Sequence, residues 1–90
     1  MNKEQAETIA LQALSFLAKD DKLLSHFLTN TGLTLQELKK RIPEPDLLGG
    51  VLDAILMNDT VLLNFCNAAS LSPETIIMAR KVLPGGYSIE

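Results

Sequence analysis

The chain has 90 residues, of which 47% are apolar and 21% are charged, the composition of a soluble globular domain with one hydrophobic core. Its net charge of −3 gives no long-range attraction toward nucleic acid or anionic lipid. A lone cysteine, a polar N-terminal segment and the lack of a long apolar run exclude an internal disulfide, a secretory signal and a membrane span, so we expect a cytoplasmic protein.

The apolar residues recur at spacings of three and four, which predicts an all-α protein of about six short helices in a compact bundle. The first helix begins at the N-cap Asn2. Asp20 caps the second helix, which ends near Gly32, a residue type that adopts the left-handed C-cap conformation without steric penalty. Thr34 caps a short third helix, which Pro43 ends.

The fourth helix, at roughly residues 45 to 57, is apolar nearly all round. We expect it to be either a central helix or one that a second copy of the protein covers. Gly49 and Gly50 fall inside it, where each glycine costs about 0.5–1 kcal/mol relative to alanine. We therefore expect backbones to approach closely at this point, or the helix to start later.

Two more helices follow. Asn58 or Asp59 caps the fifth helix, and Ser72 caps the sixth. The single domain then spans residues 1–84. Residues 85–90 hold glycine breakers and a short mixed run, which predicts a disordered tail. In the alternative interpretation, this tail docks on a neighbouring molecule.

A shift of 38 positions aligns the second half of the chain with the first. Asp21 then meets Asp59, and Phe27 meets Phe65. Further identical pairs are Leu14 and Leu52, Leu24 and Leu62, and Leu33 and Leu71, and Thr34 with Ser72 is a similar pair. This pattern indicates either a repeated three-helix unit or two unrelated helix-turn-helix segments that share only the usual capping and core residues. In both cases the halves pack on each other.

The corners at residues 29–38 and 67–76 have the spacing of a DNA-binding helix-turn-helix. A recognition helix contacts base edges with its N-terminal residues, which here are Leu35, Gln36 and Glu37. Only Gln36 suits that role. We therefore interpret the corners mainly as folding devices.

A basic cluster follows on the same helix: Lys39, Lys40 and Arg41. Cations at a helix C-terminus are stabilised by the macrodipole, which is the favoured explanation. As phosphate contacts, the three residues would instead support a helix-turn-helix-like nucleic-acid-binding protein, which we keep as the alternative.

No residue pattern predicts catalysis, a cofactor or a metal site. His26 falls on a solvated face, with Ser25 about 100° around the helix, so the two do not aim at one point. Cys66 follows Phe65 on an apolar helix and is interpreted as a buried small hydrophobe, with a reactive thiol as the alternative. Asp53 either marks an exposed stripe of the fourth helix or meets a donor of a partner at an interface.

Three segments carry a resemblance that covers nearly the whole chain: LQALSFLAKDDKLLSHFLTNTGL, VLDAILMNDTVLLNFCNAASLSP and ARKVLPGG. With them the sequence resembles a family of short bacterial proteins known as domain-of-unknown-function family 3572. The shared features are core, cap and corner residues. The family has no assigned activity, so the resemblance implies no functional residue.

From these observations we expect a small non-enzymatic helical module for protein–protein interaction, which binds a protein partner or associates with itself. The expected interaction surface is the fourth helix around Gly49, Gly50, Val51 and Asp53.

Overall fold

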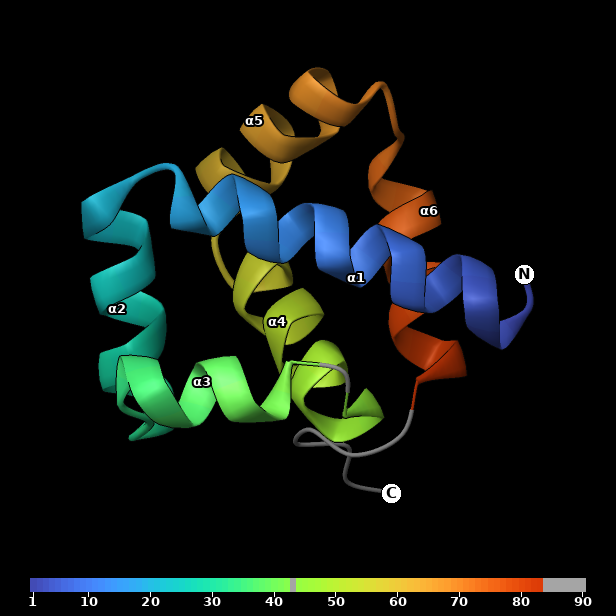
Figure 1. Cartoon of the computed structure of the whole chain (residues 1–90). Helices are drawn as coiled ribbons and strands as arrows, with labels where there is room; N and C mark the ends of the chain where they lie inside the picture. Colours follow the sequence, from blue (N-terminus) through green and yellow to red (C-terminus); the bar gives the residue numbers. More distant parts are fainter. Residues whose placement is uncertain (43, 84–90) are drawn as a thin grey trace.

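The computed structural model describes residues 1–42 and 44–83 and folds them into six α-helices (Figure 1). The described residues contain no strand, which confirms the all-α prediction. The helices are α1 Lys3–Ala18, α2 Asp21–Thr31, α3 Leu35–Arg41, α4 Pro45–Leu56, α5 Asp59–Ala69 and α6 Pro73–Val82.

Polar side chains start five of the six helices, each by accepting a backbone N–H of the first turn. These N-caps are Asn2, Asp20, Thr34, Asn58 and Ser72. The fifth helix therefore uses Asn58 and not Asp59. The exception is α4, which has no side-chain cap and begins with Pro45, whose missing N–H needs no partner at that position.

The central element of the bundle is α4, which packs against α1, α5 and α6. Its buried residues include Leu48, Leu52 and Ile55, each at most 1% exposed. This confirms the first of the two expectations for the apolar fourth helix. Other helices of the same chain cover these buried residues.

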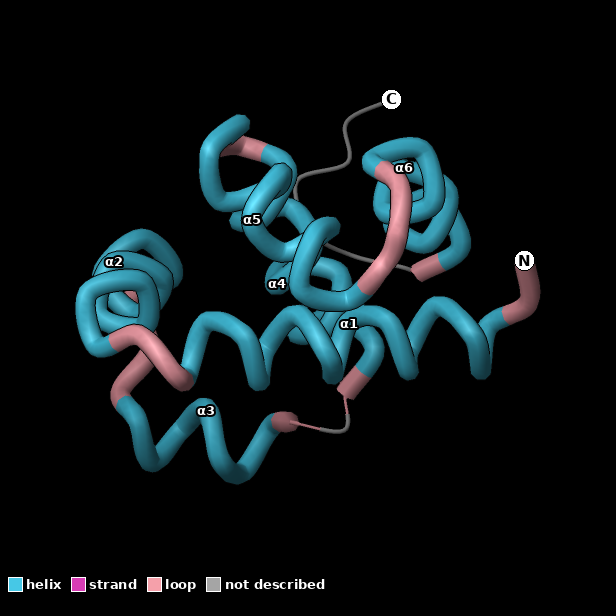
Figure 2. The backbone as a smooth tube through the Cα atoms, turned by 90° about the horizontal axis from the view of Figure 1, so that it is seen from above, coloured by secondary structure: helices cyan, strands magenta, loops and turns pink. Residues whose placement is uncertain are grey.

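The longest helix, α1, lies across the other elements (Figure 1). In the view from above, α2, then α4 with α5, and then α6 follow one another along it (Figure 2). Phe16 of α1 packs against Phe65 of α5, and the centroids of the two rings are 5.5 Å apart. Among the described residues, α2 has an extended contact with α1 alone.

At the offset of 38 residues, α2 and α5 coincide at both ends, α1 and α4 coincide at their C-terminal ends, and α3 and α6 coincide at their N-terminal ends. Both α2 and α5 have 11 residues, and each ends at a residue in the left-handed conformation, Gly32 at φ 75° and Ser70 at φ 58°. The packing of the third elements differs. α6 packs on α1 and α4, whereas α3 buries Leu38 alone and has no extended contact with another helix.

The predicted end of the third helix at Pro43 and the predicted tail at residues 85–90 lie outside the described residues. In residues 1–42 and 44–83, none of the helices combines the length and the hydropathy that crossing a bilayer requires.

Candidate functional site

A half-open pocket of about 620 Å³ lies between α2 and the C-terminal half of α4. The end of α1 and the start of α5 complete its lining. Its lining residues are Leu17 from α1; Leu23, His26, Phe27, Asn30 and Thr31 from α2; Gly50, Asp53, Ala54 and Met57 from α4 and its C-cap; and Asn58 and Val61 from the start of α5. Its size is within the range of known ligand and side-chain pockets, about 300–1,000 Å³.

The two long walls of the pocket follow the same helical spacing. Residues 23, 26, 27 and 30 line it from α2, and residues 50, 53, 54 and 57 line it from α4. Each set is spaced i, i+3, i+4 and i+7, so each wall is one face of a helix two turns long. At a rise of about 1.5 Å per residue, each wall extends over about 10 Å.

The buried lining residues of the pocket are apolar, and its exposed lining residues include polar side chains beside Met57. Leu17, Phe27 and Val61 are 3%, 2% and 9% exposed and belong to the hydrophobic core. At the rim, His26 and Asn30 are exposed. An apolar floor with a few polar groups at the rim is typical of binding pockets.

Gly50 forms part of the α4 wall without the close contact that we expected. A Cβ atom added at this position would meet no heavy atom within 4 Å, and its φ lies outside the left-handed region. The expectation of a close backbone approach is therefore wrong for Gly50. The helix also does not start later, since it begins at Pro45. The missing side chain leaves the pocket wall open.

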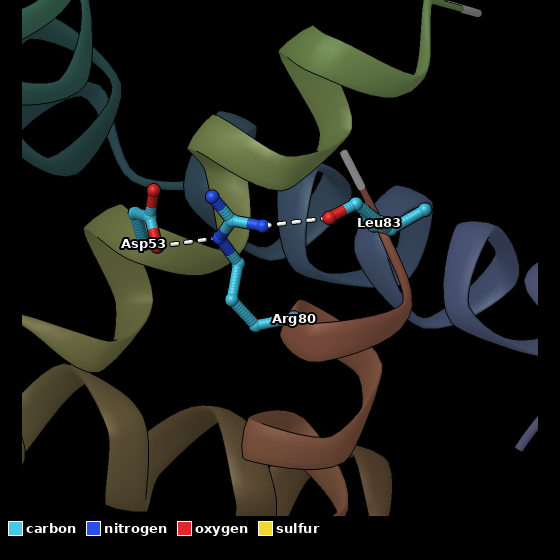
Figure 3. A network of polar contacts seen from close by, with 3 residues as sticks. All are labelled: Asp53, Arg80 and Leu83. Carbon is cyan, nitrogen blue, oxygen red and sulfur yellow. Dashed lines mark hydrogen bonds and ion pairs between the residues drawn. The ribbon is translucent and has the colours of Figure 1, made fainter. Parts of the chain in front are cut away.

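Asp53 lies one turn after Gly50 and forms an ion pair with a helix distant in sequence (Figure 3). The Nε of Arg80 donates to its Oδ1 at 2.6 Å, and the Nη1 of Arg80 donates to the carbonyl oxygen of Leu83 at 2.9 Å. The side chains of Asp53 and Arg80 are 21% and 13% exposed. Asp53 thus joins α4 to α6 from the wall of the pocket.

The second oxygen of this carboxylate lacks a donor. Oδ2 of Asp53 is shielded from solvent and has no hydrogen-bond partner among the described residues. A buried acceptor without a partner costs about 1–3 kcal/mol. Asp53 is therefore not on a solvated stripe, and among the described residues only one of its two carboxylate oxygens has a hydrogen-bond donor.

The four residues expected to form one interaction surface are divided by the fold. Gly49 is buried and Val51 is 0% exposed, so both belong to the core of the chain. Gly50 and Asp53 line the pocket. The reason is that positions 50, 53, 54 and 57 share one helical face, whereas residues 49 and 51 point elsewhere around the helix.

The basic cluster of α3 is also divided. Lys39 and Lys40 are exposed. The Nε of Arg41 donates to Oε1 of Glu44 at 2.8 Å. Glu37 accepts the backbone N–H of Thr34 and so completes the cap of α3, which adds a carboxylate where a recognition helix would face bases.

The two candidate reactive residues lie apart. Cys66 is 5% exposed and is not in the pocket. Burial raises the pKa of its thiol. His26 is exposed at the pocket rim. In the described part of the chain, no group of three His, Cys, Asp or Glu side chains is placed to hold a metal ion.

The pocket and the bond from Arg80 to Asp53 were not predicted from the sequence. One signal was present, the carboxylate of Asp53 in the apolar run that follows the first turn of the helix, because such a group needs a cation or donors. The sequence did not indicate Arg80 as the partner, because Arg80 is 27 residues away from Asp53 in the chain.

The model of the family described as "Protein of unknown function (DUF3572)" matches residues 3–86 of the chain. No curated protein and no solved structure matches the sequence.

Proposed function

The chain belongs to the DUF3572 family, whose description assigns no activity, and we propose that this member is a small, non-enzymatic helical module that binds other proteins. The proposal includes association with a second copy as one form of such binding. It also places the protein in the bacterial cytoplasm, in keeping with its composition and single cysteine.

The pocket between α2 and α4 is the observation that carries the proposal. Its floor is apolar, and Met57 at its edge is 76% exposed. An exposed methionine is a flexible apolar contact that adapts to different partner surfaces. Apolar hollows with polar rims on small proteins are typical of interaction sites.

The chemistry of the candidate reactive groups supports a binding role over catalysis. A nucleophilic cysteine needs a lowered pKa and access to its substrate. Cys66 has a raised pKa and is buried. His26 shares the pocket with the carboxylate of Asp53, but that carboxylate accepts the Arg80 bond.

Nucleic-acid binding, the alternative, has less support because the arginines near the basic helix ends bond to acceptors of the chain itself. Arg41 pairs with Glu44, and Arg80 pairs with Asp53. Phosphate binding requires cations that are free to replace counterions. Lys39 and Lys40 meet this condition by exposure, and two lysines on a chain of net charge −3 form a weak site.

Site-specific photo-crosslinking in the native host tests the proposal. A benzophenone amino acid replaces Met57 at the pocket edge, and in a matched control it replaces Met78 of α6, which is 50% exposed and lies outside the pocket. We expect protein adducts from position 57 and not from position 78. Adducts with a second copy identify self-association. The absence of protein adducts at position 57 would refute the proposal.

A further inference from the structure

The pocket has a counterpart in the other half of the chain, where an aromatic ring fills the corresponding space. At the offset of 38 residues, Phe27 of α2 corresponds to Phe65 of α5. Ala54 of α4 corresponds to Phe16 of α1. Phe16 packs against Phe65 with the ring planes at 58°, whereas both of their counterparts line the pocket. The residue that would supply the corresponding ring is thus an alanine.

The helices that carry these residues correspond as well. α2 and α5 have 11 residues each, and residues 19–20 and 57–58 join them to the helices before them. The contact between Phe16 and Phe65 joins α1 of the first half to α5 of the second. The pocket lies between α4 of the second half and α2 of the first, so an exchange of the halves converts one pair of helices into the other. The group that fills the first space therefore indicates which group fits the second.

The pocket is open on the side where this ring would lie. Gly50 is one turn before Ala54 on the same face of α4, and a Cβ atom at position 50 would meet no heavy atom within 4 Å. At the offset of 38 residues, Gly50 corresponds to Gln12. The side chains of Gln12 and Phe16 on α1 thus correspond to a hydrogen atom and a methyl group on α4, which leaves room for a ring from another molecule.

The lining residues beside this space suit an aromatic occupant. Met57 is 76% exposed at the edge of the pocket, and a methionine sulfur makes favourable contacts with aromatic rings. Leu23 is partly buried and lines the α2 wall, across from Ala54. Phe27 is 2% exposed and offers little surface. A bound ring would therefore rest mainly on Leu23, Ala54 and Met57.

Building on the proposed function, we propose that the pocket binds an aromatic side chain of a protein partner in the place that corresponds to the Phe16 ring. Aromatic side chains that fill a pocket are among the residues that contribute most to the affinity of protein interfaces. The partner would supply the ring that position 54 lacks. No charged group of the partner is required, because Asp53 is paired with Arg80.

Blocked amino acids serve as probes, because they carry the stated side chain and need no known partner. The probe is N-acetyl-phenylalanine amide, and the matched control is N-acetyl-cyclohexylalanine amide, whose ring is saturated. Amide chemical shifts of the full chain measure the binding of both and locate the site. We expect shifts at Leu23, Ala54 and Met57, and about two- to tenfold tighter binding of the aromatic probe, because contacts of the ring with sulfur and aromatic groups add to the burial of apolar area. Equal binding of the two probes would overturn the preference for an aromatic ring.

Ala54→Phe supplies the missing ring from within the chain. We expect this variant to raise Tm by roughly 4–8 °C and to abolish binding of the aromatic probe, because its own ring occupies the site. Ala68→Phe is the control, since it adds the same ring at an exposed position of α5 outside the pocket. It should neither raise Tm nor weaken binding. A lower Tm of Ala54→Phe, or unchanged probe binding to it, would overturn the correspondence with the Phe16 site.

Photo-crosslinking separates this inference from the proposed function. In the native host, Ala54→Phe should remove the protein adducts that a benzophenone amino acid forms at position 57, whereas Ala68→Phe should keep them. Adducts that persist with Ala54→Phe would overturn the aromatic side chain as the occupant and would still support the proposed function. Probe binding without any protein adducts at position 57 would refute the proposed function and overturn the protein source of the ring, which assigns the pocket to small aromatic molecules.

Discussion

Arg80 of α6 donates to Asp53 of α4 at 2.6 Å and to the carbonyl oxygen of Leu83 at 2.9 Å, so one guanidinium joins the central helix to the end of the last one. The residues of the ion pair are 27 positions apart in the chain. Both side chains are less than a third exposed, so water screens the pair less than it screens a surface pair.

Replacement of Asp53 by alanine is expected to lower the free energy of unfolding by about 1–3 kcal/mol, because Arg80 loses an acceptor in a half-buried site. Asp53→Asn keeps an acceptor and should cost less. Urea denaturation measures both. The control is Glu44→Gln, which breaks the exposed pair with Arg41 and should cost under about 0.5 kcal/mol. Equal losses at positions 53 and 44 would contradict the difference between the two pairs.

Gly50→Ala is expected to stabilise the chain by about 0.5–1 kcal/mol, because α4 gains helix propensity and the new methyl group meets open space. For a domain of this size, such a gain raises Tm by roughly 2–8 °C. Thermal unfolding followed by circular dichroism measures the change. A lower Tm would mean that position 50 is more tightly packed than the structure indicates.

Gly32 after α2 and Ser70 after α5 occupy equivalent left-handed positions, so glycine and serine can be exchanged between them. Ser70 adopts a left-handed conformation at φ 58°, which disfavours a residue with a Cβ by about 1–2 kcal/mol. Ser70→Gly should therefore stabilise the chain by up to about 1 kcal/mol, and Gly32→Ser should destabilise it by a similar amount. Since a Cβ at Gly32 meets no atom within 4 Å, the cost there is one of backbone conformation. Changes of the same sign in the two variants would refute this explanation.

Cys66 is expected to react slowly with a thiol reagent in the native state and rapidly after denaturation, because it is 5% exposed and its pKa is raised. The raised pKa also links stability to pH. Above the ordinary pKa of 9.0, the thiol of the unfolded chain loses its proton first, so the unfolded state binds fewer protons and stability falls as pH rises toward the folded pKa. Cys66→Ala should remove this part of the fall. A native thiol that reacts as rapidly as the denatured one would show that the site is open.

Duplex DNA at low salt is expected to show no saturable binding in an anisotropy titration. The arginines at positions 41 and 80 pair with carboxylates, and the net charge is −3. If binding does occur, a plot of the logarithm of the association constant against the logarithm of the salt concentration should have a slope of about −0.9 for each phosphate contacted. A loss of that binding in Lys39→Gln and Lys40→Gln would establish the alternative function.

The local structure of the chain was predictable because it depends on neighbouring residues. Asn2, Asp20, Thr34 and Ser72 begin the helices they were expected to begin, since a cap needs only a side-chain acceptor two or three residues before a free N–H. The central place of α4 was one of two expectations from its apolar surface. These features require no knowledge of how distant segments meet.

The site was only partly predictable, because it depends on which faces of distant helices meet. Gly50 and Asp53 were singled out as unusual, and both line the pocket. Gly49 was singled out with Gly50, and Val51 was included as part of the same apolar helix, but their direction around α4 places both in the core. Phe27 was identified only as the counterpart of Phe65 and Asn58 only as a candidate cap, and both become pocket residues because α2 and the start of α5 pack near the same part of the bundle.

The attachment of α2 has a mechanical consequence for the pocket. One wall, α4, is held by three other helices, whereas the opposite wall, α2, has an extended contact with α1 alone. Local displacement requires the least free energy where the fewest contacts break. We therefore expect the α2 wall of the pocket to move more easily than the α4 wall, so that the pocket widens at α2 while the core around α4 keeps its packing.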